Sequence, residues 1–117
     1  MRFVIAIAAL VSAQSAISAG PLSKFSERSP VGDYISSRSL EDIERCLIDM
    51  DGWLAPNVYR QPDKPNEVKI LWISGGMSAG LSAARVDLTK TPDGGTRVIS
   101  WMPAKQAKAC APERAPN

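Results

Sequence analysis

The chain has 117 residues, and its 14 basic and 12 acidic side chains are spread without a block of one sign. This balance disfavours functions that need a strongly basic face, such as binding to nucleic acid or to an anionic lipid surface. The chain contains no histidine, so any catalytic site would lack the commonest general base and any zinc site would lack a principal ligand.

The N-terminus has the three-part layout of a secretory signal peptide. Arg2 precedes an apolar run over residues 3–11, and small, mildly polar residues follow up to Gly20. The run is too short to cross a hydrocarbon core, which needs about 20 apolar residues; the alternative is a buried N-terminal helix. We expect residues 1–19 to be a signal peptide cleaved after Ser18 or Ala19, which leaves a periplasmic or secreted protein without a stable membrane anchor.

The mature chain keeps two cysteines, Cys46 and Cys110. An even, small number of cysteines in an exported protein favours a disulfide, and here one pairing is possible. The alternative is two free buried thiols. Two thiolates without histidine do not complete a tetrahedral zinc shell, so we expect no metal and no cofactor.

The first half of the mature chain predicts one clear helix. Residues 20–30 are polar and without periodicity, which is typical of a flexible leader. Residues 31–36 form a possible first strand. Ser39 can cap a helix that ends at Gly52, and its apolar face recurs at three- and four-residue spacing. The residues of that face are Leu40, Ile43, Leu47 and Met50.

The second half predicts strands. Alternating or β-branched residues favour strands over residues 57–61, 67–74, 82–91 and 96–102, followed by a short helix over residues 104–109. Residues 82–91 would also fit a helical face, but the alternation of polar and apolar residues over residues 85–89 favours the strand.

These elements predict an α+β fold in the order (β)-α-β-β-β-β-α. An antiparallel sheet would be covered on one face by the one long helix, and the disulfide Cys46–Cys110 would tie that helix to the end of the chain. Residues 31–111 would form this single domain, and residues 112–117 a disordered tail.

A glycine-rich stretch, ILWISGGMSAGLS over residues 70–82, resembles a phosphate-binding loop in its spacing. Leu81 stands where that motif needs lysine, and a strand follows where the motif needs a helix. We therefore interpret the stretch as a turn between strands. Ser78 within it would be a nucleophile only with a base, and the neighbouring sequence supplies none.

Aromatic residues are the best candidates for a ligand site. Trp53, Tyr59, Trp72 and Trp101 could line a groove for a sugar, a peptide or an apolar ligand, although core packing explains tryptophans equally well. A small acidic cluster around the end of the helix could bind calcium, but solvated charges at a helix end also account for it. Its members are Asp42, Glu44, Asp49 and Asp51.

The segment SLEDIERCLIDMDGWLAPNVYRQPDKPNEVKILWISGG, followed by RVDL, GGTRVISW and AKAC, resembles small exported proteins of sphingomonad-type alphaproteobacteria. The resemblance covers most of the mature chain and implies a bacterial envelope setting. It carries over no catalytic or binding residue.

The sequence thus favours a non-catalytic binding or interaction module of the bacterial envelope, with an envelope protein or a small ligand as partner. Two other classes stay open. One is a small histidine-independent enzyme that would use convergent carboxylates such as Asp33 and Asp87. The other is an inhibitor of an envelope enzyme.

Overall fold

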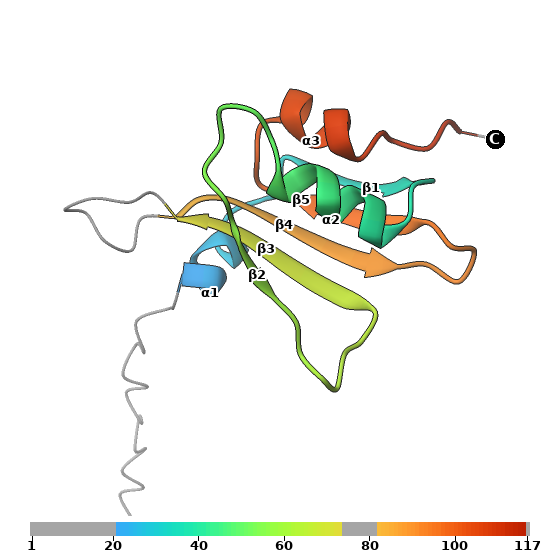
Figure 1. Ribbon diagram of the computed structural model, residues 1–117, viewed down its shortest axis with the longest axis horizontal. Helices are drawn as coiled ribbons and strands as arrows, with labels where there is room; N and C mark the ends of the chain where they lie inside the picture. Colours follow the sequence, from blue (N-terminus) through green and yellow to red (C-terminus); the bar gives the residue numbers. More distant parts are fainter. Residues whose placement is uncertain (1–20, 74–81, 117) are drawn as a thin grey trace, which may run out of the picture.

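The computed structural model of the chain describes residues 21–73 and 82–116 (Figure 1). Five antiparallel strands form one sheet with the order β1-β5-β4-β3-β2. The strands are β1 (Gly32–Ser36), β2 (Asn57–Tyr59), β3 (Glu67–Ile73), β4 (Ser82–Lys90) and β5 (Thr96–Ser100), and the helices are α1 (Pro21–Ser26), α2 (Leu40–Ile48) and α3 (Ala104–Cys110). The predicted α+β class, the antiparallel sheet and the helical cover are confirmed.

Helix α2 begins where the sequence predicts and ends earlier. The Ser39 hydroxyl accepts a hydrogen bond from the Asp42 backbone N–H at 3.2 Å, as expected of an N-cap. Ile43 and Leu47 are fully buried against the sheet. The helix ends at Ile48, before Met50, because an acidic residue at the negative end of the helix dipole disfavours further turns, and Asp49 and Asp51 both lie there.

The two faces of the sheet differ because side chains alternate along each strand. In β4, Val86 and Leu88 point into the core beneath α2, whereas Arg85 and Asp87 point to the opposite face. Helices α2 and α3 cover the core face, and α1 lies on the opposite side of the sheet (Figure 1).

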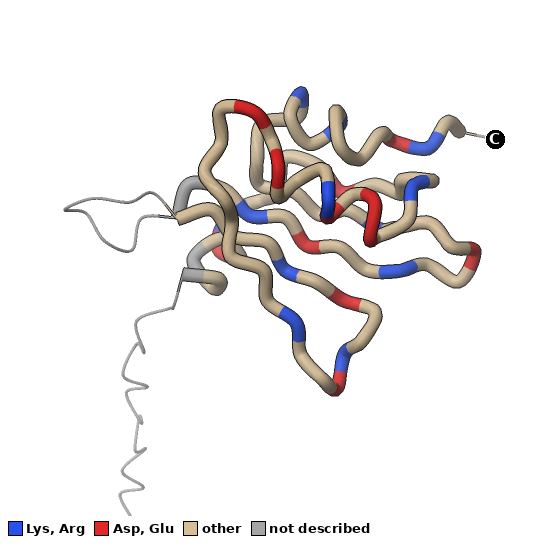
Figure 2. Tube along the Cα trace, in the orientation of Figure 1, with Lys and Arg blue, Asp and Glu red and all other residues tan. Residues whose placement is uncertain are grey.

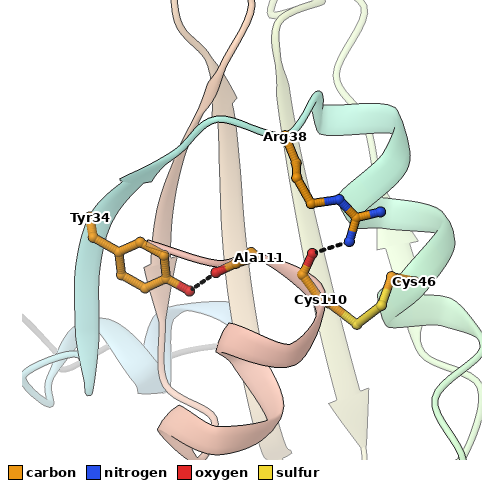
Figure 3. The surroundings of a disulfide bond; sticks show 5 residues. All are labelled: Tyr34, Arg38, Cys46, Cys110 and Ala111. Atoms are coloured by element: carbon orange, nitrogen blue, oxygen red, sulfur yellow. Dashed lines mark hydrogen bonds between the residues drawn. A yellow bond between two sulfur atoms is a disulfide. The ribbon is translucent and has the colours of Figure 1, made fainter. Parts of the chain in front are cut away.

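The disulfide Cys46–Cys110 joins α2 to α3, with 5.4 Å between the two Cα atoms, which confirms the predicted pairing (Figure 3). Two hydrogen bonds hold the same end of α3. The Arg38 guanidinium donates to the Cys110 carbonyl, and the Tyr34 hydroxyl donates to the Ala111 carbonyl, each at 2.6 Å. The end of α3 is therefore attached to α2, to the loop before it and to β1.

Residues 20–30, expected to be a flexible leader, contain the short helix α1. Phe25 in α1 is only 3% exposed and packs edge-to-face on Trp101, with 6.2 Å between the ring centroids. A helix of six residues is too short to show periodicity in the sequence, and tertiary contacts hold it: the buried Phe25 ring and a hydrogen bond from Arg85 to the Leu22 carbonyl.

Residues 112–117, expected to be a disordered tail, pair in part with the edge of the sheet. The Arg114 backbone N–H donates to the Ile35 carbonyl at 2.7 Å, and Glu113 forms an isolated antiparallel bridge with Ser36. The Arg114 side chain adds an ion pair with Asp93 at 2.8 Å. The unpaired edge of β1 is the reason, since exposed strand edges recruit backbone partners.

We expect reduction of the disulfide, or the double change of Cys46 and Cys110 to alanine, to lower the free energy of unfolding by about 4 kcal/mol. The physical reason is the chain entropy of the unfolded state, because the bond closes a loop of 64 residues. Urea unfolding with and without reductant measures the difference. A midpoint that does not move on reduction would contradict the prediction.

We expect Tyr34→Phe to lower the free energy of unfolding by about 1 kcal/mol, because it removes the buried hydrogen bond to Ala111. Burial, and secondarily the charge of Glu113, raises the pKa of the Tyr34 hydroxyl above its ordinary value of 10.0. The folded chain therefore holds this proton more tightly than the unfolded chain. The resulting stability is complete below the unfolded pKa and is lost as pH rises through the folded pKa.

Urea unfolding across alkaline pH should show a decline in stability that is shallower in Tyr34→Phe than in the wild type. Tyr59→Phe, at an exposed tyrosine, is the matched control and should leave the free energy of unfolding at neutral pH unchanged. Identical slopes in the wild type and Tyr34→Phe would show the prediction to be wrong.

Candidate functional site

The four aromatic candidates lie on two different faces of the sheet. Trp53 and Trp72 form an edge-to-face pair on the core side, with 5.6 Å between the ring centroids. Trp101 lies on the opposite face beside Phe25. Tyr59 lies on the outer strand β2 next to Lys69, also on the opposite face. The structure therefore does not bring the four side chains together in one groove.

Trp101 belongs to a closed cluster of the protein's own groups. The Arg85 guanidinium lies 4.8 Å from the centre of the Trp101 ring and donates two hydrogen bonds to Asp87, at 2.8 and 2.7 Å. Arg85 also donates to the Leu22 carbonyl of α1, and the Trp101 Nε1–H donates to the Arg28 carbonyl at 3.0 Å. Each polar group is engaged, so this cluster attaches α1 to the sheet.

The carboxylates proposed for a histidine-independent enzyme share one face of the sheet. Asp33 and Asp87 both lie opposite Ile99 on β5, one on each side. Arg97 donates to the Asp33 carboxylate at 2.8 and 3.1 Å and holds the pKa of that carboxyl below its usual value. A carboxyl that acts as general acid needs a raised pKa, and a carboxylate that acts as general base needs an oxygen that is free to accept a proton. The arginine partners of both aspartates work against either role.

A groove of about 350 Å³ runs between the turn after α2 and helix α3, beside the disulfide. We call it the disulfide groove. Its apolar lining comes from Met50, Trp53, Ala109 and the bond between Cys46 and Cys110. The cross-link creates the groove, because it holds the end of α2 against a helix that begins more than fifty residues later in the chain.

Several polar groups of the disulfide groove accept hydrogen bonds, and the Gln106 amide and the Trp53 indole also carry N–H donors. Asp49 and Asp51 line it, and neither forms an ion pair with any residue that the structure describes. The Gln106 Oε1 atom is buried and accepts no hydrogen bond from the described part of the chain. The negative end of the α2 dipole adds to the same potential. This arrangement favours a ligand that brings both donors and apolar groups.

Within residues 21–73 and 82–116, no helix is long and apolar enough to cross a membrane, and no group of three or more metal-binding side chains gathers. Two members of the acidic cluster have cationic partners, since Asp42 pairs with Arg45 at 2.9 Å and Glu44 pairs with Arg60. The glycine-rich turn and Ser78 lie outside the described residues.

We expect Arg85→Gln to lower the free energy of unfolding by about 2–3 kcal/mol, because it leaves a mostly buried Asp87 without its partner. It should also release α1, which hydrogen exchange of residues 22–28 would detect. Arg97→Gln on the same face is the matched control, and its exposed pair with Asp33 should cost below about 1 kcal/mol. Equal losses in the two variants would contradict the role given to Arg85.

Comparison with protein-family models, with curated proteins and with solved structures found no match to this chain.

Proposed function

We propose that this protein is a non-catalytic interaction module of the bacterial envelope, and that the disulfide groove holds a basic, apolar segment of a partner protein. The observation that carries the proposal is the one-sided chemistry of the groove. Its lining is largely apolar, its charged groups are two carboxylates without a cationic partner among the described residues, and its one buried unpaired polar atom is an acceptor, the Gln106 Oε1.

The apolar component is of the kind that protein interfaces use. Methionine and tryptophan are enriched at the buried centres of interfaces, and Met50 and Trp53 are half-buried in the groove. Leu54, next to Trp53 in the chain, is an exposed apolar side chain, at 71% exposure. The volume of about 350 Å³ lies within the range of small binding pockets, so it accommodates a short segment rather than a large surface.

The electrostatic component selects the partner's charge. Asp49 and Asp51 follow α2 directly, so their carboxylates lie near the negative end of its dipole. A lysine or arginine beside an apolar residue would meet both features at once. An acidic or purely apolar segment would leave these acceptors without donors, at a cost in binding free energy.

Two features support the envelope setting. The first 19 residues have the layout of a signal peptide, and the two cysteines form a disulfide, which persists in oxidising compartments such as the periplasm. A disulfide that shapes the groove also makes oxidation a condition for binding. An exported protein would meet that condition after it folds outside the cytoplasm.

A blocked hexapeptide of alternating lysine and leucine tests the proposal, with the same peptide carrying glutamate for lysine as its counterpart. We expect the lysine peptide to shift the Trp53 indole resonance in NMR spectra of the oxidised mature protein, and the glutamate peptide to leave it unchanged. Asp51→Asn should weaken binding about threefold to tenfold, which corresponds to the range for one charged contact.

Asp63→Asn is the control. It removes a carboxylate from the turn between β2 and β3, and the variant should bind the lysine peptide as the wild type does. Equal binding of the two peptides, or binding that survives reduction of the disulfide, would show that the disulfide groove does not select its partner in the proposed way.

A further inference from the structure

A second hollow, of about 440 Å³, lies on the opposite face of the sheet from the disulfide groove. We call it the sheet hollow. Its floor is the outer part of the sheet, where Tyr59 of β2 pairs with Lys69 of β3. The turn between these strands contributes Lys64, and α1 forms the facing wall with Ser23 and Ser26. Figure 1 shows α1 beneath the sheet on this side.

The sheet hollow carries an excess of positive charge. Lys64 and Lys69 form no ion pair with any residue in the described ranges, and Glu67 is the one acidic residue among those that line the hollow. Arg60 and Arg85 line it as well, although each has a carboxylate partner outside it. An anionic group would therefore find two ammonium groups that form no ion pair among the described residues, with Glu67 as the one carboxylate beside them.

The register of the sheet explains why Lys69 forms no ion pair with a neighbouring strand. Lys69 lies between Tyr59 on β2 and Asp87 on β4. Asp87 would be the natural partner of the lysine, but Arg85 engages both of its carboxylate oxygens. The buried cluster that attaches α1 thus also leaves Lys69 without a counter-ion from the neighbouring strand.

The remaining lining suits a polyhydroxylated ring. Tyr59 is 40% exposed and offers an aromatic face beside Lys69. Aromatic side chains commonly provide the apolar surface for such rings. The hydroxyls of Ser23 and Ser26 and the amide of Gln61 line the same space, and they can donate and accept hydrogen bonds.

We propose that the sheet hollow binds an acidic sugar, with the sugar carboxylate at Lys64 and Lys69 and a ring against Tyr59. The volume of about 440 Å³ falls within the range of small-molecule sites, roughly 300–1,000 Å³. This site is independent of the disulfide groove, because the two are lined by different residues on opposite sides of the sheet.

Digalacturonate is a suitable probe, with cellobiose as the neutral disaccharide and acetate as the isolated anion. In amide NMR titrations of the oxidised mature protein, we expect digalacturonate to shift the resonances of Tyr59 and Lys69, and raising the NaCl concentration to weaken binding. Lys69→Gln and Lys64→Gln should each weaken binding about tenfold, as expected for loss of one charged hydrogen bond. Lys105→Gln on α3, on the other side of the sheet, is the matched control and should leave the affinity unchanged.

Three results would overturn the proposal. Equal binding of cellobiose would show that charge plays no part. Equal shifts with acetate would show an adventitious ion only. No shift at Tyr59 or Lys69 with digalacturonate would show that the sheet hollow is not a sugar site. The groove variant Asp51→Asn separates the two proposals, because it should leave digalacturonate binding unchanged while it weakens binding of the lysine peptide.

Discussion

The bond between Cys46 and Cys110 is the constraint on which the arrangement of the helices depends. A domain this small buries a modest core, and α3 has only seven residues to contribute to it. The disulfide attaches that short helix to α2, and the hydrogen bonds from Arg38 and Tyr34 fix its last turn (Figure 3). Without the bond, no covalent link would hold α2 against α3, and the two walls of the disulfide groove could move apart.

The alternation of side chains in the strands predicted much of this fold. The elements that were missed are those that leave no local pattern in the sequence. The capped helix, the strands and the cysteine pair are visible because each leaves a periodic or compositional signal. Helix α1 leaves none, since its position depends on the packing of Phe25 on Trp101 and on the hydrogen bonds of Arg85, which are contacts between distant parts of the chain. The pairing of Glu113 with Ser36 is equally invisible, because an unpaired strand edge can be recognised only once the strand order is known.

The aromatic candidates do not form a single site because they lie on two different faces of the sheet. Trp72 shares its face with Val68 and Ile70, and all three are buried in the core. Trp101 lies opposite Arg85 across β4 and β5, a register that no local pattern specifies. The predicted cysteine pairing places the end of α2 beside α3, although no groove was predicted there. The sequence could not predict that the Gln106 Oε1 atom is buried there.

The charged residues are unevenly distributed over this protein, which its net charge of +2 does not reveal. Helix α2 and the turn after it carry five acidic residues and one basic residue over residues 40–52. The region of β2, β3 and their turn carries Arg60, Lys64 and Lys69, with acidic residues between them (Figure 2). Because these regions border different faces of one sheet, a cationic partner and an anionic ligand would not compete for space. Their charges would also be separated by the sheet and screened by salt, so neither would strongly hinder the other. A near-neutral composition therefore excludes a large field of one sign and still permits a local excess of negative charge at one proposed site and of positive charge at the other.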